Sequence, residues 1–264
     1  MKRITFSDNP LAFSTSWLLP PAALAALRGL LSLYIFVTII FIWAWYGAHG
    51  ESSAIGETFS YFTWLTYFGL GFYFLVAALH SAYYARTGRS LFTRWPRALL
   101  ALHSLFYSTV TTFPFLVTIV YWGAIYSPPW FTEKFEAWAN ISQHGFNSLF
   151  ALLEIGLATT PPHPLINLPF LVLILLLYLA LAYLTYHDEG WYPYSFLDIK
   201  TNGSGLVTGY CFGILAAILV IFAISCALIW LRRKLTKEVV KRSARDVSDR
   251  GEENLEAGQE KSYF

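Results

Sequence analysis

The sequence has very little charge for its length. Only 13% of its 264 residues are charged, whereas 56% are hydrophobic and 19% are aromatic, and the mean hydropathy is +0.49. A soluble domain of this size carries about twice that share of charged residues. The composition excludes a soluble globular protein and predicts an all-α, polytopic integral membrane protein without a separate soluble domain.

Cysteine and familiar catalytic motifs are also scarce. The chain has two cysteines, Cys211 and Cys226. They lie on one predicted helix, about 22 Å apart at about 1.5 Å per residue, so they cannot form a disulfide with each other. There is no glycine-rich phosphate loop, no HExxH and no CxxC motif. We therefore expect no cofactor and no nucleic-acid partner.

What the sequence does have is long apolar runs. A helix needs about 20 mostly apolar residues to cross the bilayer core, and six runs reach that length. A proline, Pro114, lies in the middle of the third and predicts a kink. The six predicted spans are about Leu27 to Tyr46, Thr58 to Tyr84, Arg97 to Tyr126, Glu136 to Ala158, Leu165 to Tyr186 and Leu206 to Leu231.

The basic residues predict the orientation, because short cytoplasmic loops retain Lys and Arg. Sixteen of the 18 Lys and Arg fall on one side of the six spans, and Lys134 and Lys200 fall on the other. Both termini are thus predicted to be cytoplasmic. The start of the chain lacks the apolar core and cleavage site of a secretory signal, so the first span should stay as an anchor.

The predicted organisation has three parts. Residues 1–26 form a cytoplasmic N-terminal segment, residues 27–231 the six-helix transmembrane domain, and residues 232–264 a basic and then acidic cytoplasmic tail, largely disordered. The basic half of the tail is expected to lie on anionic headgroups as a short helix. Asn140 and Asn202 begin Asn-x-Ser sequons on the predicted non-cytoplasmic side, which makes both candidate glycosylation sites.

Polar residues inside the spans are the candidates for function, because they are costly in lipid and usually face the bundle interior. An outer layer contains Thr66 and His144, which are each about 12 Å in from the non-cytoplasmic end of their spans. Thr63 shares a helix face with Thr66, and Asn147 shares one with His144. A hydroxyl beside an imidazole is the minimum pair for nucleophilic acyl transfer. The competing interpretation is structural, since such residues also join membrane helices by hydrogen bonds.

An inner layer lies nearer the cytoplasm and contains His80, His103 and Glu154. Two imidazoles and a carboxylate are able to bind a metal ion. They do not form a close ligand motif, however, and Glu154 could equally pair with Arg97 or with a histidine. The sequence therefore favours packing or charge pairing over a metal site here.

Four segments carry a resemblance to known membrane proteins. In order, "WLTYFGLGFYF", "TTFPFLVTIVYWGAIY", "QHGFNSLFALLEI" and "YPYSFLD" resemble the androgen-induced-protein (ADTRP-like) family of six-span proteins. They are similar at least as much to the rolling stone family, whose members share a Leu-Thr element and a His-Gly-x-Asn element. The resemblance covers most of the chain from about residue 58 to residue 231.

The first resemblance implies a hydrolase of fatty acid esters of hydroxy fatty acids, in which an intramembrane threonine and histidine act. By motif, the threonine is Thr66, with Thr63 the second choice, and the histidine is His144. The sequence departs from the family at Asn147, where the androgen-induced proteins have a second histidine. It also departs at Tyr194-Ser195-Phe196-Leu197, whose proline is displaced to Pro193.

The resulting hypothesis is an intramembrane lipid esterase of the endoplasmic reticulum, another endomembrane or the plasma membrane, with membrane lipids as its surroundings and a lipid ester as substrate. Thr66 is the expected nucleophile and His144 the base, and Asn147 would donate to the oxyanion or orient the imidazole. Asp198 is a candidate third member. The alternatives are a non-catalytic scaffold of the rolling stone kind and, with less support because no internal repeat is visible, a small transporter.

Overall fold

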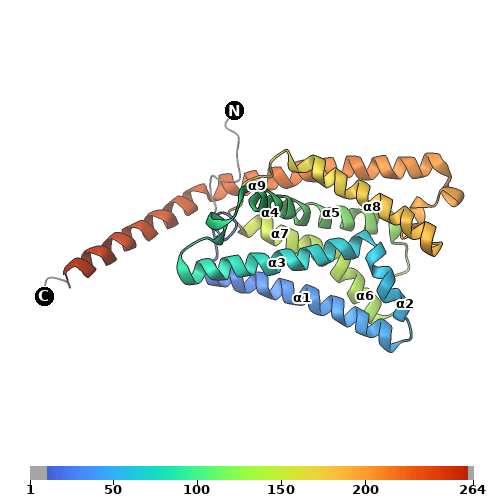
Figure 1. Ribbon diagram of the computed structural model, residues 1–264, viewed down its shortest axis with the longest axis horizontal. Coiled ribbons are helices and arrows are strands. Elements are labelled where there is room, and N and C mark those ends of the chain that lie inside the picture. Colours follow the sequence, from blue (N-terminus) through green and yellow to red (C-terminus); the bar gives the residue numbers. More distant parts are fainter. Residues whose placement is uncertain (1–10, 261–264) are drawn as a thin grey trace.

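The computed structural model describes residues 11–260 of the chain and, of the side chains after Lys237, only that of Val239. These residues form helices, joined by turns, and an isolated antiparallel bridge between Ser16 and Ala158. In Figure 1 the long helices lie side by side as a bundle, and the last one extends far beyond it. The longer helices are α1 (Pro21–Ala48), α3 (Phe62–Thr87), α4 (Arg97–Val110), α7 (Asn147–Leu157), α8 (Asn167–Glu189) and α9 (Ile199–Glu260). The shorter elements are α2 (Ser52–Glu57), η2 (Thr58–Ser60), η3 (Leu91–Arg94), α5 (Phe113–Val120), η4 (Tyr121–Ile125), α6 (Lys134–Ile141), η5 (Ser142–Phe146) and η6 (Ser195–Leu197).

Five helical stretches in the described part of the chain are long and apolar enough to cross a membrane, which confirms an all-α membrane protein. They correspond to the first, second, third, fifth and sixth predicted spans. The fourth predicted span is present as a run of helix from Lys134 to Leu157, but it is divided into α6, η5 and α7. Six spans with both termini in the cytoplasm thus stay a prediction.

The third span is broken where the sequence predicts a kink. Helix α4 ends at Val110, and α5 begins at Phe113, directly before Pro114. Proline has no backbone N–H and its ring clashes with the preceding turn, so the α-helical hydrogen-bond ladder cannot continue through this point. The hydroxyls of Thr111 and Thr112 bond back to the carbonyls of Tyr107 and Ser108, which satisfies acceptors at the break.

The core is built mainly of aromatic and branched side chains. Helices α1 and α3 run side by side, with Ile35 and Ile39 packed in the same cluster as Tyr67, Leu70 and Phe74. Gly71 permits the close approach, because a Cβ atom there would lie 2.9 Å from the Ile35 side chain. A second cluster joins α5, α8 and α9 around residues such as Leu116, Leu171 and Phe222.

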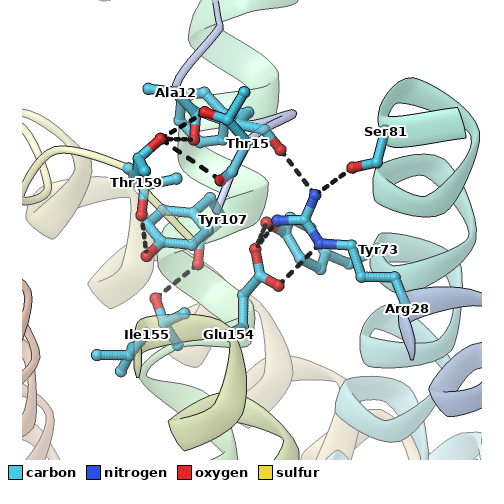
Figure 2. Close-up of polar contacts among 12 residues, drawn as sticks. Ala12, Thr15, Arg28, Tyr73, Ser81, Tyr107, Glu154, Ile155 and Thr159 are labelled. Atoms are coloured by element: carbon cyan, nitrogen blue, oxygen red, sulfur yellow. Dashed lines mark hydrogen bonds and ion pairs between the residues drawn. The ribbon is translucent and has the colours of Figure 1, made fainter. Parts of the chain in front are cut away.

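A buried ion pair ties the inner end of the bundle together. The Arg28 guanidinium donates to both carboxylate oxygens of Glu154, at 3.0 and 2.5 Å, and the Tyr73 hydroxyl donates to the same carboxylate at 2.8 Å. Figure 2 shows Arg28 reaching from α1 to Glu154 on α7, with Ser81 of α3 on its other side. Glu154 thus pairs neither with Arg97 nor with a histidine, the partners that the sequence left open, because Arg28 and Tyr73 occupy its carboxylate.

The segment before α1 is packed into the bundle at this end. The Phe13 carbonyl accepts a bond from Arg28 at 2.8 Å, and the Phe13 ring contacts His103 and Tyr107. Thr15 bonds to Thr159, and the Trp17 indole donates to the Gly156 carbonyl at 2.6 Å. The part of the predicted cytoplasmic segment from residue 11 onward is therefore a structural element, whereas residues 1–10 lie outside the described residues.

The last helix runs on into the tail. Helix α9 continues through the basic residues and on to Glu260, and the largely disordered tail stays a prediction. The chain after Pro193 contains no proline, so nothing in its covalent structure interrupts the helix. Near its start α9 bends at Gly203, whose φ of 76° and ψ of 153° are open to glycine alone. Arg232 is buried and bonds to the carbonyls of Ile155 and Thr160.

The ion pair generates the first prediction. Replacing Glu154 with alanine leaves a buried guanidinium without its counter-ion, which is expected to reduce the free energy of unfolding by about 3–5 kcal/mol. The double variant Arg28→Met/Glu154→Leu removes both charges and should recover most of the loss. Thermal unfolding of the purified protein in detergent measures both effects.

The control is Asp188→Ala, which breaks an exposed contact with His187 and should leave the melting temperature nearly unchanged. If Glu154→Ala melts at the same temperature as Asp188→Ala, the ion pair does not hold the bundle together.

Candidate functional site

His144 lies in a π-helical turn that faces another π-helical turn. It belongs to η5, and its imidazole stacks on the ring of Tyr121 in η4, with centroids 3.5 Å apart and planes 9° from parallel. Such turns are rare and are frequently found at functional sites. Two in contact, one of them containing the predicted histidine, make this the leading candidate site among residues 11–260.

The backbone of η5 is held by side chains. His144 Nδ1 lies 3.1 Å from the carbonyl oxygen of Asn140, and the Trp122 indole donates to the carbonyl of His144 at 2.9 Å. Directly after this turn, the Ser148 N–H donates to the side chain of Asn147 at 2.7 Å. A side chain of η4 thus bonds to the backbone of η5.

Asn147 and Ser148 join this region to the proline break of the third span. The Asn147 amide nitrogen and the Ser148 hydroxyl both donate to the Pro114 carbonyl, at 3.3 and 3.0 Å, and both residues bond to Thr118. Asn147 therefore links α7 to α5. The structure gives no support to the expectation that it donates to an oxyanion or orients the imidazole.

The two predicted threonines, Thr63 and Thr66, lie in the walls of different cavities. Thr63 is buried and lines a cavity of about 290 Å³, here called the first cavity, between the start of α3, α5, α8 and α9. Thr66 is half-buried and lines a cavity of about 350 Å³ between α3, α4, α5 and α8, the second cavity. Its hydroxyl donates to the carbonyls of Phe62 and Thr63 in its own helix. In the described structure no hydrogen bond joins either threonine to His144.

The first cavity is almost wholly apolar and adjoins the histidine. Its polar atoms come from a few side chains, among them Thr63 and Tyr121, and the rest of its wall is aliphatic or aromatic, including Leu116 and Phe212. Because Tyr121 also stacks on His144, its ring separates the cavity from the imidazole. Phe62 and Tyr178 line both cavities, and their rings, 4.9 Å apart, form a shared wall.

The residues of the inner layer, His80, His103 and Glu154, are engaged in ring packing and in an ion pair. His80 stacks on Phe92 at 4.0 Å, and His103 lies 4.7 Å from the same ring. Glu154 is occupied by Arg28 and Tyr73, as Figure 2 shows. The described residues contain no group of three or more His, Cys, Asp or Glu side chains placed to hold a metal ion. The three residues of this layer are therefore not brought together as a donor set.

Two further polar residues need comment. His163, which sequence reasoning missed, is buried in the loop after α7 and contacts the hydroxyls of Ser108, Thr111 and Ser225 at 3.0–3.2 Å. The prolines on either side of His163 predict only a loop at this position. Within the described residues, Asp198 forms no hydrogen bond or ion pair with His144 and instead accepts bonds from Thr201 and from the Lys200 N–H at the start of α9. These bonds, the Thr201 one first, lower the pKa of the Asp198 carboxyl.

Comparison with known protein families gives a match over most of the chain. The model of a family described as FAR-17a/AIG1-like protein matches residues 24–231, which include both cavities and both π-helical turns. No curated protein and no solved structure matches the chain.

The contacts of Asn147 generate the second prediction. Asn147→Ala leaves the buried Pro114 carbonyl and Thr118 hydroxyl with one partner fewer each, which is expected to cost about 1–3 kcal/mol of stability. Leu149→Ala, on the exposed face of the same helix, is the control and should cost less. Thermal unfolding in detergent compares the two. Equal melting temperatures would show that the Asn147 link contributes nothing.

Proposed function

The chain belongs to the FAR-17a/AIG1-like family, and from this premise we propose that it is an intramembrane hydrolase of lipid esters, acting on substrates such as fatty acid esters of hydroxy fatty acids. The observation that carries the proposal is the buried imidazole of His144, which belongs to one π-helical turn and stacks on Tyr121 of the other, a residue that lines an apolar cavity. The proposal includes six spans, cytoplasmic termini and a position in an endomembrane or the plasma membrane.

The two cavities support a substrate with long apolar chains. Both lie among the membrane-spanning helices, and their linings are almost entirely hydrocarbon. A hydrocarbon chain from the bilayer would fill them without burying an unpaired polar group. The hydroxyls in their walls include Thr63 in the first cavity and Thr66 in the second, and these are polar groups that an ester would meet.

In the proposed reaction, the hydroxyl oxygen of Thr66 attacks the ester carbonyl while His144 takes its proton. The tetrahedral intermediate expels the alcohol, which receives that proton, and leaves an acyl-threonine. Water, activated by His144, then hydrolyses the acyl-enzyme to release the fatty acid and restore the threonine. Because no hydrogen bond joins Thr66 to His144 in the described structure, the reaction requires the two side chains to come within hydrogen-bond reach of each other, directly or through one water, when the ester binds.

A non-catalytic scaffold is the second candidate, and a specific observation favours it. The Thr66 hydroxyl is engaged with two carbonyls of its own helix, and Asn147 and Ser148 link two helices. These are the contacts expected of polar residues that only join membrane helices.

The third prediction separates the two candidates. Purified protein in detergent is expected to hydrolyse long-chain esters, and Thr66→Ala and His144→Ala should each lower kcat at least about a hundredfold, as loss of a nucleophile or base does. A fluorophosphonate probe should label the wild-type protein and fail to label Thr66→Ala. Thr63→Ala tests the second-choice threonine in the same assay.

Thr109→Ala is the matched control. Thr109 also lines the second cavity, and its hydroxyl also bonds back to its own helix, at 2.7 Å from the Phe106 carbonyl. The control should keep wild-type turnover. If folded Thr66→Ala and His144→Ala also keep it, the esterase mechanism is wrong and the scaffold is preferred.

A further inference from the structure

We infer that Tyr121 and Asn140 form a positioning clamp that holds His144 as its Nδ1–H tautomer and so leaves Nε2 as the nitrogen that accepts a proton. The tautomer follows from the geometry of the described residues. The use of Nε2 as a base rests on the proposed function.

The tautomer is determined by the partner of Nδ1. That nitrogen lies 3.1 Å from the backbone carbonyl oxygen of Asn140, and a carbonyl oxygen can only accept a hydrogen bond. Nδ1 must therefore carry the proton in this contact. A neutral imidazole has one N–H, so its Nε2 has a free lone pair. Within residues 11–260, the structure shows no hydrogen bond to Nε2.

Asn140 is itself fixed at both ends of its amide. Its Nδ2 donates to the Glu136 carbonyl at 2.9 Å, and its Oδ1 accepts from the Tyr121 hydroxyl at 2.6 Å. The Tyr121 bond crosses from η4 to α6. It therefore holds the turn that contains the Asn140 carbonyl against the element that carries the stacking ring.

The Tyr121 ring provides the second half of the clamp. Its face lies against the imidazole at 3.5 Å, which opposes tilting of the His144 ring out of this plane. A 180° rotation of the ring about its Cβ–Cγ bond would return it to the same plane but place a carbon, in place of Nδ1, opposite the Asn140 carbonyl. That hydrogen bond would then be lost. One residue thus supplies both the stacking surface and the hydroxyl, and it also lines the first cavity. The sequence marks Asn140 only as a sequon.

A nuclear magnetic resonance experiment tests the tautomer without reference to activity. The protein is labelled with ¹⁵N-histidine in detergent, and His144→Ala assigns the signals of His144. A ring nitrogen with a proton resonates far from one without, so the spectrum identifies which nitrogen carries it. We expect Nδ1–H in the neutral wild-type protein. An Nε2–H tautomer would overturn the inference.

Tyr121→Phe tests the clamp, because it keeps the stacked ring and removes only the hydroxyl bond to Asn140. We expect the His144 signals to show a mixture of both tautomers, and kcat for a long-chain ester to fall about tenfold with KM changed less than twofold. The control, Tyr126→Phe, removes a hydroxyl that makes no hydrogen bond within residues 11–260 and should change neither quantity.

The two levels of the inference fail separately. If Tyr121→Phe shows a single Nδ1–H tautomer and has the same kcat as Tyr126→Phe, then the clamp is wrong even though the protein is an esterase. If the wild-type protein hydrolyses no ester, the proposed function is wrong, and the ¹⁵N spectra of the wild type and of Tyr121→Phe still decide whether the clamp exists.

Discussion

The buried pairing of Arg28 with Glu154 is the interaction on which the arrangement of the bundle depends. A guanidinium that is buried in the membrane domain must find its hydrogen-bond partners within the protein. Arg28 makes four hydrogen bonds, to both Glu154 oxygens, to Ser81 and to the Phe13 carbonyl. These partners come from α7, from α3 and from the chain before α1, so one side chain fixes the positions of four segments. The N-terminal segment is packed into the bundle partly because its carbonyl completes this set.

The need of buried polar groups for partners within the protein also explains the contacts of the outer layer, the region around His144. In lipid, a helix that departs from the α-helical ladder leaves backbone groups that only protein can satisfy. At the π-helical turn that contains His144, Trp122 of the facing turn donates to the His144 carbonyl. At the proline break, the Pro114 carbonyl accepts from Asn147 and Ser148 of α7. Hydrogen bonds of side chains thus join η4 to η5, and the proline break to the residues that follow η5. An apolar cavity adjoins them where α5, α8 and α9 do not close completely.

Composition and apolar run length were sufficient to predict the class and five of the spanning helices, and Pro114 predicted the break in the third, since these depend on local chemistry and on the thickness of a bilayer. The partner of Glu154 was not predictable in this way. Arg28 is the second residue of the first predicted span, and only its contacts with Glu154 of α7 and Ser81 of α3 show that it faces inward. His163 was missed for a related reason. Its loop reads as a surface connection, yet it is folded back among α4 and α9.

The candidate site shows the limit of reasoning from depth. Equal distances from the membrane edge place Thr66 and His144 at one level, but depth does not specify the direction in which a side chain points. Around a regular helix that direction follows from spacing, with about 3.6 residues per turn. Residues 142–146 form a π-helical turn, which shifts the direction of every side chain after it relative to that count. Spacing predicts the relative directions of the Thr63 and Thr66 side chains because α3 is a regular helix there. The directions in which the His144 and Asn147 side chains point could not be derived from spacing. The residue that the distortion brings to His144 is Tyr121, from a segment whose sequence carries no polar motif.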